Sequence, residues 1–374
     1  MFDRKIRILS FQNAHNFGAV LQAFGLQQTL ISMGFKDVKF LNYNPKYLRD
    51  RYNPLSSFNT KRSFRTIKDF LSFIANYPFF LISSYKRNKA FEGSISRLLI
   101  QTDRLISSEK DLENESFDVL ICGSDQIWNT SLTGAFDRVF LGYGPYKNRG
   151  QIISYAPSTE LSSLTDKRTE ELAGLLSNFS YISVREIQVK EKLTKYLNRN
   201  IEVCVDPTIL CGSEAFVKIT APRIIKEDYI LVYAYDYRKD IIQRLIKSIP
   251  NNEKYRVEII YLSAKGRKDV ANNFIHSEIR IEEFLSYFKY ASYIVTNSFH
   301  GLAFSLLYRK NFNVAYEEGK HIRCLSLLKQ LDLESRFVKI QEPNWDTLAY
   351  DNINLKLQEL RAQSLNYLKK AIGI

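Results

Sequence analysis

Short apolar runs alternate with amphipathic stretches along most of the chain. Apolar runs of about four to eight residues between polar loops predict buried strands, and apolar positions at helical spacing predict helices. In the N-terminal half, strands are expected at residues 5–10, 38–43, 117–122, 151–156, 181–184 and 201–205. An amphipathic helix with apolar residues from 19 to 30 is expected between the first two strands, with Gly34 as its stop.

The same alternation recurs in the C-terminal half. Strands are expected at residues 229–233, 256–262, 292–296 and 313–316, and helices at residues 239–248, 281–290 and 302–308. The tail has a further amphipathic face, which we expect to pack against the body. Two cycles of strand and helix predict an α/β fold with two open, doubly wound parallel sheets of the Rossmann-like kind.

The length of 374 residues favours two domains, because single cores seldom grow so large. The weakest pattern lies at 208–228, which we interpret as the linker. We therefore predict an N-terminal domain at 1–215, a C-terminal domain at 216–345 and a helix at 346–374. Residues 45–115 are predicted to form a mainly helical insertion in the first domain.

The composition excludes several classes of protein. Four cysteines without a CxxC pair and four histidines without metal-ligand spacing predict no metal site. The N-terminus lacks the apolar stretch of a signal peptide, and the apolar segment 70–83 is too short to span a bilayer and is interrupted by Asn76 and Pro78. We therefore expect a cytoplasmic protein.

The net charge of +13 is compatible with a nucleic-acid face, an affinity for anionic lipid or a preference for phosphorylated ligands. No helix-turn-helix, zinc finger or RNA-binding signature is present, so we expect no nucleic-acid partner. The basic residues gather most closely at 61–89, around aromatic positions. We interpret this segment as a helical pair with a solvated basic face, and contact with a membrane surface is the alternative.

The hexapeptide TNSFHG, which includes His300, lies between two apolar runs. Residues 297–301 are expected to form a loop between the strand and the helix that starts at 302, which places His300 beside a helix N-terminus. Such a terminus attracts anions, especially phosphate. A titratable imidazole beside an anion site indicates an active site, although a histidine that caps the turn or fills a core pocket remains the alternative.

A second polar loop, Gly123–Gln126, follows the third expected strand. Its residues Gly123, Ser124 and Gln126 could present backbone N–H groups to an anion, with Asp125 as a carboxylate base. The alternative is that Asp125 caps a turn. The chain has neither GxGxxG after a strand nor GxxxxGK[ST], so neither a dinucleotide-dependent enzyme nor a P-loop nucleotidase is supported.

Polar residues also lie at the ends of two further predicted elements. Arg185 follows the fifth expected strand and could grip a phosphate or carboxylate in a bidentate way. A salt bridge, with Glu186 as one candidate partner, is the alternative. Asn16 and Gly18 lie where the first helix begins, so they could contact a ligand or serve only as capping residues.

The ordered segments FGAVLQAFGLQQTL, FDVLICGSDQIWN, SYAPS, ISVRE, VDPTIL, IVTNSFHGLAFSLLYRKNF and HIRCLSLLKQLDL resemble the polysaccharide pyruvyl transferase family over most of the chain. The resemblance implies a GT-B-like enzyme whose two domains face each other across a cleft, with the acceptor on the N-terminal side and the donor on the C-terminal side. It implies transfer of a pyruvyl group from phosphoenolpyruvate to a sugar of a bacterial capsule or exopolysaccharide, or its lipid-linked precursor, as a cyclic ketal. No cofactor is implied, and peripheral contact with the inner membrane face fits a lipid-linked acceptor.

The resemblance also assigns residues. Arg185 matches the family arginine that holds the donor, and His300 matches the essential histidine. Members often have an arginine where this chain has Ser298, so either Arg323 or a lysine compensates, or the donor or reaction differs. The residues around His300 are then expected to bind substrate: Asn297, Ser298, Phe299 and Gly301.

The expected mechanism uses His300 as a general acid or proton relay and Asp125 as the base for the sugar hydroxyl. Three alternatives remain open. They are a GT-B glycosyltransferase that uses a nucleotide sugar, a non-catalytic member of the family, and a basic binding module for nucleic acid or membrane.

Overall fold

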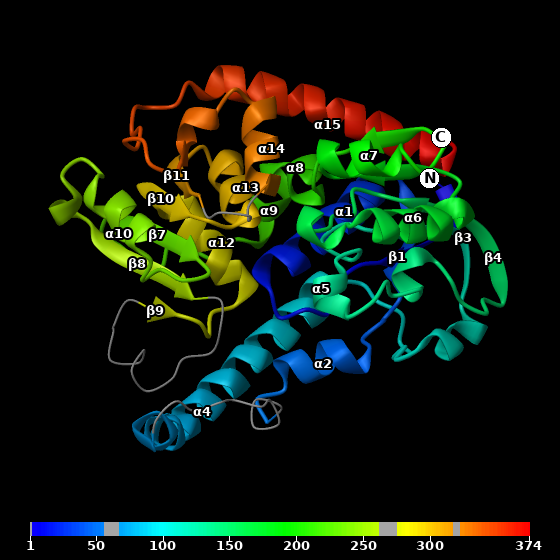
Figure 1. Ribbon diagram of the computed structural model, residues 1–374, viewed down its shortest axis with the longest axis horizontal. Coiled ribbons are helices and arrows are strands. Elements are labelled where there is room, and N and C mark those ends of the chain that lie inside the picture. The colour runs from blue at the N-terminus through cyan, green and yellow to red at the C-terminus, as the bar shows by residue number, and fades with distance from the viewer. Residues whose placement is uncertain (1, 56–66, 262–274, 317–321) are drawn as a thin grey trace.

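The computed structural model describes residues 2–55, 67–261, 275–316 and 322–374. Its strands form two separate groups with helices around them, and the last helix runs along one side of both groups (Figure 1). All named strand pairs are parallel. The predicted fold class, α/β with two Rossmann-like halves, is therefore confirmed.

The N-terminal sheet has the strand order β2-β1-β3-β4, and a bridge between Ile153 and Tyr181 continues it to the pair β5-β6. Buried residues concentrate toward the carboxyl ends of β1, β3 and β4, the ends at which polar loops follow. The strands are β1 (Phe2–Leu9), β2 (Phe35–Phe40), β3 (Ser116–Cys122), β4 (Asn148–Ser154), β5 (Ile182–Val184) and β6 (Ile201–Val203). The main helices of this half are α1 (Phe17–Ser32), α6 (Asp166–Leu175) and α7 (Ile187–Leu193).

The C-terminal sheet has the order β12-β11-β10-β7-β8-β9. Its central strand β7 is buried at all six positions, as expected for a parallel strand covered on both faces. The strands are β7 (Tyr229–Ala234), β8 (Arg256–Tyr261), β9 (Ile275–His276), β10 (Tyr293–Thr296), β11 (Asn311–Ala315) and β12 (Phe337–Val338). The helices are α10 (Asp240–Lys247), α12 (Ile281–Tyr290), α13 (Phe299–Leu307) and α14 (Ile322–Gln330).

The expected linker is not irregular over its first part. It contains α8 (Pro207–Cys211) and α9 (Ser213–Ile219), and the predicted boundary after residue 215 falls inside α9. Four of the five residues of α8 are buried, so the segment lacks the polar face that a sequence pattern needs to reveal a helix. The domain limits themselves stay a prediction.

The apolar core is continuous between the two sheets. Phe17 of α1 stacks on Phe284 of α12, with 4.5 Å between the ring centroids. Phe216 of α9 contacts both Phe24 of α1 and Phe304 of α13. Aromatic side chains from both halves therefore share one cluster beneath the place where the halves face each other.

The tail forms α15 (Tyr350–Ile372), which returns from the C-terminal sheet to the N-terminal one (Figure 1). The hydroxyl of Tyr367 donates to the carbonyl of Ser154 at 2.7 Å, and Gln151 and Arg4 donate to carbonyls near the end of the helix. The expectation that the tail packs on the body is confirmed.

The insertion at 45–115 is mainly helical, with α2 (Lys46–Tyr52), α4 (Ile67–Leu98) and a 3-10 turn η1 (Glu109–Asn114). The predicted helical pair at 61–89 is wrong from residue 67 onward, because α4 continues through Pro78; residues 61–66 lie outside the described residues. Contacts of its C-terminal half with the body hold α4 in place, and such tertiary contacts override a local break. No helix among the described residues is long and apolar enough to cross a membrane.

Candidate functional site

The N-termini of α1 and α13 meet where the two halves face each other. Asn16 is the N-cap of α1, and its side chain accepts a hydrogen bond from the amide of Ala19. Gly18 lies so close to His300 that a Cβ atom on it would be 2.0 Å from Nδ1 of the imidazole. The absence of a side chain at Gly18 therefore makes room for the ring, and Asn16 has the capping role that was one of its two predicted roles.

His300 lies in the first turn of α13 and not in a loop. The predicted helix start at 302 is wrong, because Ser298 is the N-cap and its carbonyl accepts the first helical bond, from Leu302. Phe299, His300 and Gly301 consequently have backbone amides without an acceptor inside the helix. The expectation that His300 lies beside a helix N-terminus at the end of a strand is confirmed.

Arg185, Asp206 and His300 form a buried cluster. Arg185 directly follows β5, and its Nη1 donates to Oδ2 of Asp206 at 2.6 Å while its Nε donates to Glu186 at 3.0 Å. The same Oδ2 of Asp206 lies 3.7 Å from Nε2 of His300. The side chains of Arg185, Asp206 and His300 are 3%, 0% and 9% exposed. The salt bridge considered for Arg185 is therefore present, with two carboxylates.

The Asp206 carboxylate is fixed on both sides. Burial by itself would raise the pKa of Asp206, but His300, Arg185 and the amide of Thr208 outweigh burial and hold this pKa well below its ordinary value. Oδ1 accepts from the amide and the hydroxyl of Thr208, so Asp206 is also the N-cap of α8. An ionised carboxylate in a fixed position thus separates the guanidinium from the imidazole.

Three polar atoms of this cluster are buried without a hydrogen-bond partner among the described residues. They are Nη2 of Arg185, Nε2 of His300 and Oε2 of Glu186. Buried polar atoms are usually satisfied by protein or by bound water and ligands. The cluster therefore retains two nitrogens and one carboxylate oxygen that could bind water or a ligand.

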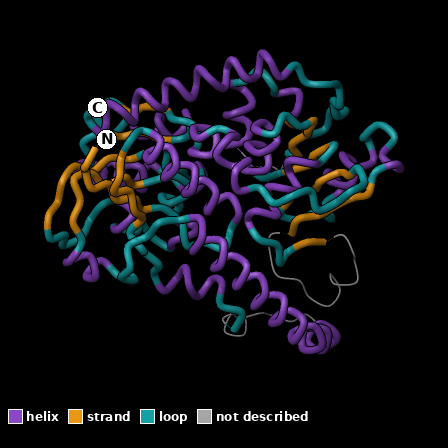
Figure 2. Tube along the Cα trace, turned by 180° about the vertical axis from the view of Figure 1, so that it is seen from behind, coloured by secondary structure: helices purple, strands orange, loops and turns teal. Residues whose placement is uncertain are grey.

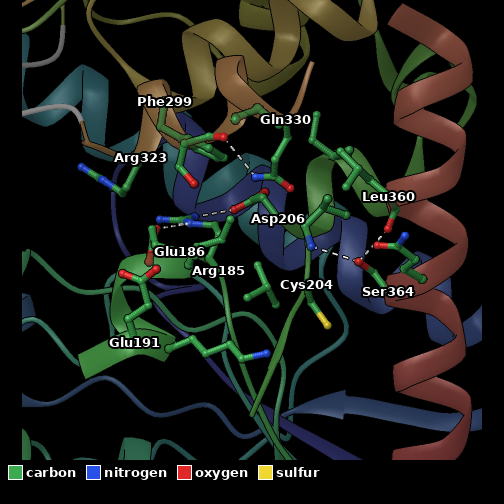
Figure 3. A pocket seen from close by; sticks show the side chains of 18 of the residues that line it. Arg185, Glu186, Glu191, Cys204, Asp206, Phe299, Arg323, Gln330, Leu360 and Ser364 are labelled. Carbon is green, nitrogen blue, oxygen red and sulfur yellow. Dashed lines mark hydrogen bonds and ion pairs between the residues drawn. The ribbon is translucent and has the colours of Figure 1, made fainter. Parts of the chain in front are cut away.

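A cavity of about 490 Å³ opens beside the cluster, between the two halves (Figure 3). Arg185 and Asp206 reach it from the N-terminal half, Phe299 and Arg323 from the C-terminal half, and α15 closes a further side. The ring of Phe299 lies under the guanidinium of Arg185, 4.5 Å from its carbon. The predicted cleft between the halves is therefore present, although His300 does not line this cavity and lies 3.7 Å from Asp206, which does.

The charges around the cavity are balanced. The lining residues with positive charge are Arg185, Lys190 and Arg323, and those with negative charge are Glu186, Glu191 and Asp206. Because two of these carboxylates already bind Arg185, this arginine has only Nη2 left for a ligand. A bidentate grip on an anion, as considered for Arg185, would require it to leave a carboxylate.

The predicted anion-binding loop 123–126 is only partly available. The amide of Gly123 donates to the carbonyl of Leu9, and the buried hydroxyl of Ser124 donates to the carbonyl of Ala156. The carbonyl of Gln126 accepts from Asn129 in the next turn. Gly123 has a φ of 137°, so its glycine is needed for the backbone path. These three residues shape the loop itself.

Asp125 is half-buried at the tip of the same loop, with a left-handed φ of 66°. Its negative charge acts on Arg185 and also on Tyr233 and Tyr235, which come from the end of β7. The charge of Asp125 therefore reaches groups of both halves, and its predicted role as a base stays a prediction.

The residues around His300 have mainly structural contacts. The side chain of Asn297 accepts from the amide of Tyr235 at 3.0 Å, and the amide of Ser298 donates to Oγ1 of Thr296 at 3.0 Å. A Cβ atom on Gly301 would be 2.1 Å from Oγ1 of Thr296, so this glycine lets α13 pack closely on β10.

Arg323 supplies a further cation to the cavity. Its side chain lines the cavity together with Arg185, and its positive charge acts on the phenol of Tyr235. The hypothesis that Arg323 or a lysine compensates for Ser298 stays a prediction; Arg323 and Lys190 both line the cavity.

Asp206 is a residue of the site that was not predicted from the sequence. The signal was available, because VDP follows the sixth expected strand and so places a carboxylate at the carboxyl end of the sheet. Asp-Pro at the start of a helix is also typical of a simple N-cap. In the structure, Asp206 both caps α8 and binds Arg185 in the cluster. The described residues contain no group of three histidine, cysteine, aspartate or glutamate side chains suited to a metal ion.

Comparison with known proteins assigns the family. The family model "Polysaccharide pyruvyl transferase" matches residues 16–316. No curated protein sequence matches the chain. Among solved structures, UDP-N-acetylglucosamine 2-epimerase of Neisseria meningitidis bound to UDP-GlcNAc is similar at 12% identity and a TM-score of 0.44, over 99% of this chain and 93% of that chain. A putative UDP-N-acetylglucosamine 2-epimerase of Listeria monocytogenes has 10% identity and the same TM-score, over 99% and 91%. E. coli heptosyltransferase WaaC has 10% identity and a TM-score of 0.38, over 95% and 99%.

These structural similarities are too distant to indicate a substrate. The family match covers most of the chain and includes Arg185, Asp206 and His300. The chain therefore belongs to the polysaccharide pyruvyl transferase family and is a transferase that acts in polysaccharide biosynthesis.

Proposed function

We propose that the enzyme takes its pyruvyl group from phosphoenolpyruvate and attaches it to a saccharide, free or lipid-linked, as a cyclic ketal. The observation that supports this most is the buried cluster of Arg185, Asp206 and His300 at a cavity between the halves. The N-terminus of α13 lies at the same place. Together these groups provide proton transfer and anion binding at one point.

Phosphoenolpyruvate carries a phosphate and a carboxylate, so its site needs several cations or N–H donors. Arg185 offers Nη2 alone, because its other polar contacts are to carboxylates. We therefore assign most of the anion binding to Arg323, Lys190 and the first amides of α13. The Phe299 ring supports the guanidinium of Arg185 by a cation–π contact, with 4.5 Å between its centroid and the guanidinium carbon.

The proposed reaction joins two hydroxyl groups of the acceptor to the C2 carbon of phosphoenolpyruvate. One hydroxyl adds to C2 while the methylene carbon takes up a proton and becomes the methyl group. The second hydroxyl then displaces the phosphate, which leaves with the remaining proton as inorganic phosphate. His300 is proposed to deliver the first proton, Asp206 to orient the imidazole, and Asp125 to accept a proton from a hydroxyl.

Ligand protection against thermal unfolding tests the donor. Phosphoenolpyruvate should raise the melting temperature of the wild-type protein, and UDP-GlcNAc should not. The opposite pattern would instead support a glycosyltransferase that uses a nucleotide sugar, which is the alternative with the same arrangement of halves.

Turnover tests the residues. With acceptor present, wild-type protein should release inorganic phosphate from phosphoenolpyruvate and add one pyruvyl group to the acceptor, as measured by mass spectrometry. Arg185→Lys and His300→Gln should lose most of this activity, whereas Arg104→Ala, at a half-exposed position in the insertion, should keep it. Near-wild-type turnover in both site variants would eliminate the assignment.

A further inference from the structure

The outward face of α4 is apolar over about four turns. Its exposed positions Leu71, Ile74, Phe79, Ile82 and Tyr85 have between 41% and 66% of their surface open to solvent. Ala75 and Pro78 are exposed on the same face. Among the described side chains between 71 and 85, no exposed one is charged. Of the basic residues on which the predicted solvated basic face rests, Lys86 and Lys89 are exposed and Arg87 is buried, whereas the exposed face at 71–85 is apolar.

Such a face is unusual on the surface of a water-exposed protein. Single exposed apolar residues are common, but a contiguous row marks a surface that binds something. The row from 71 to 85 is about 21 Å long at the rise of an α-helix. This end of α4 also projects beyond the rest of the protein in both views (Figures 1 and 2).

Positive charge adjoins the apolar row. Lys86 and Lys89 are exposed on the next turns of α4, and Lys86 lies 4.0 Å from the half-buried Glu278. In the sequence, the basic residues between 61 and 89 are Lys61, Arg62, Arg65, Lys68, Lys86, Arg87 and Lys89, and the acidic residue there is Asp69. The whole chain has a net charge of +13. Apolar and aromatic residues next to lysines are the combination that binds anionic lipid surfaces.

The other end of α4 is tied to the site. Arg87 is buried, and its guanidinium donates to the carbonyls of His15 and Ser277, one from each half. It also lies 4.6 Å from the ring of Phe91. His15 immediately precedes Asn16, the N-cap of the helix that contacts His300. The apolar face is thus connected through α4 to the place where the halves meet.

We propose that the outward face of α4 docks the protein on an anionic membrane surface. Its apolar side chains enter the boundary between headgroups and acyl chains, and Lys86 and Lys89 face the anionic headgroups. If the acceptor is lipid-linked, as the proposed function allows, docking brings the cavity close to the plane in which that acceptor is held. The docking itself does not depend on the donor or the acceptor.

Flotation with lipid vesicles tests the proposal on the full-length protein. Vesicles of phosphatidylcholine with about one third phosphatidylglycerol should carry wild-type protein to the top of the gradient, and pure phosphatidylcholine should carry much less. The double variant Ile74→Glu, Ile82→Glu should reduce the partition coefficient at least about tenfold, because two inserting side chains are replaced by charged ones. Lys86→Gln with Lys89→Gln should remove mainly the preference for anionic vesicles.

The matched control is Leu355→Glu on α15, whose side chain is 60% exposed and so is as open as Ile82. It should bind vesicles like the wild type, and all variants should keep the wild-type melting temperature because none of the changed side chains is in the core. Wild-type protein that stays at the bottom with both vesicles overturns the proposal. Equal weakening of vesicle binding by Leu355→Glu also overturns it. So does a dimer, detected by light scattering, that only the α4 variant disrupts, because the face would then bind a second copy of the chain. Failure of phosphoenolpyruvate turnover would leave these binding results unchanged, so the two proposals fail separately.

Discussion

Replacing Gly18 with alanine tests the contact on which the site depends. The added Cβ atom would lie 2.0 Å from Nδ1 of His300, whereas an ordinary contact needs well over 3 Å. The ring or the first turn of α1 must therefore move by more than about 1 Å. Any movement of the imidazole changes its position 3.7 Å from Asp206.

Two opposing free energies set the size of the effect on stability. Overpacking at such a place costs about 1–3 kcal/mol. Alanine in a helix gains up to about 1 kcal/mol over glycine, and less in the first turn where Gly18 lies. We expect Gly18→Ala to lower the free energy of unfolding by about 1–2 kcal/mol. Turnover should fall at least about tenfold, because displacement of a catalytic group by about 1 Å is costly.

Gly174→Ala is the matched control. Gly174 lies in α6, and a Cβ atom there would meet nothing within 4 Å. This variant should therefore gain stability of up to about 1 kcal/mol and keep its turnover. Thermal unfolding and phosphate release from phosphoenolpyruvate, with acceptor present, measure both variants side by side.

Combining Gly18→Ala with His300→Ala isolates the contact. If the ring is the obstacle, the double variant should be more stable than the sum of the single effects predicts, since alanine at 300 leaves room for the new methyl group. Additive losses, or a Gly18→Ala protein as stable and active as Gly174→Ala, would refute the inferred contact between the two helix N-termini.

Three further predictions concern titration and packing at the site. Burial lowers the pKa of His15 from 6.5 to about 4; the hydrogen bond to Asn88 opposes this shift, and the charge of Arg87 adds to it. Between about pH 6.5 and pH 4, the unfolded chain therefore binds a proton at His15 that the folded protein does not bind. Stability should therefore fall by about 2–3 kcal/mol as the pH drops through this window, and His15→Gln should flatten the melting temperature against pH; an unchanged slope would contradict it. Asp206→Asn keeps the cap on α8 but leaves Arg185 with one carboxylate. It should lower the free energy of unfolding by about 2–4 kcal/mol near neutral pH and remove most of the turnover. The difference in stability from the wild type should shrink only below about pH 3.8, where the carboxyl of the unfolded wild-type chain takes up its proton. Phe299→Leu removes the ring under Arg185 and should cost about 1–2 kcal/mol and raise the KM for phosphoenolpyruvate more than it lowers kcat; a change in kcat alone would argue against a role in donor binding.

Patterns that depend on one element were predicted well from the sequence. The apolar runs placed β1, β3, β7 and β10, and the rule that ligands gather at the carboxyl ends of parallel strands identified Arg185 and the His300 junction. These features are local, so a single sequence contains them.

Features that depend on contacts between distant segments were not predicted. The pairing of Arg185 with Asp206 joins two strands, and only the folded sheet shows that the arginine is neutralised by carboxylates. The helix α8 is buried on nearly every side, so its sequence lacks a polar period. The exposure of the apolar residues of α4 was not predicted, because a sequence shows which residues can share a helix face and leaves open which face meets the body.

The aromatic cluster that joins Phe17, Phe24, Phe216, Phe284 and Phe304 has a consequence for how the protein denatures. If the chain were divided between its halves, these rings would lose their packing partners. Each fragment would then expose an apolar surface that favours aggregation. Neither fragment should then survive as an independent folding unit, and calorimetry of the intact enzyme should record one endotherm where a pair of autonomous domains would give two.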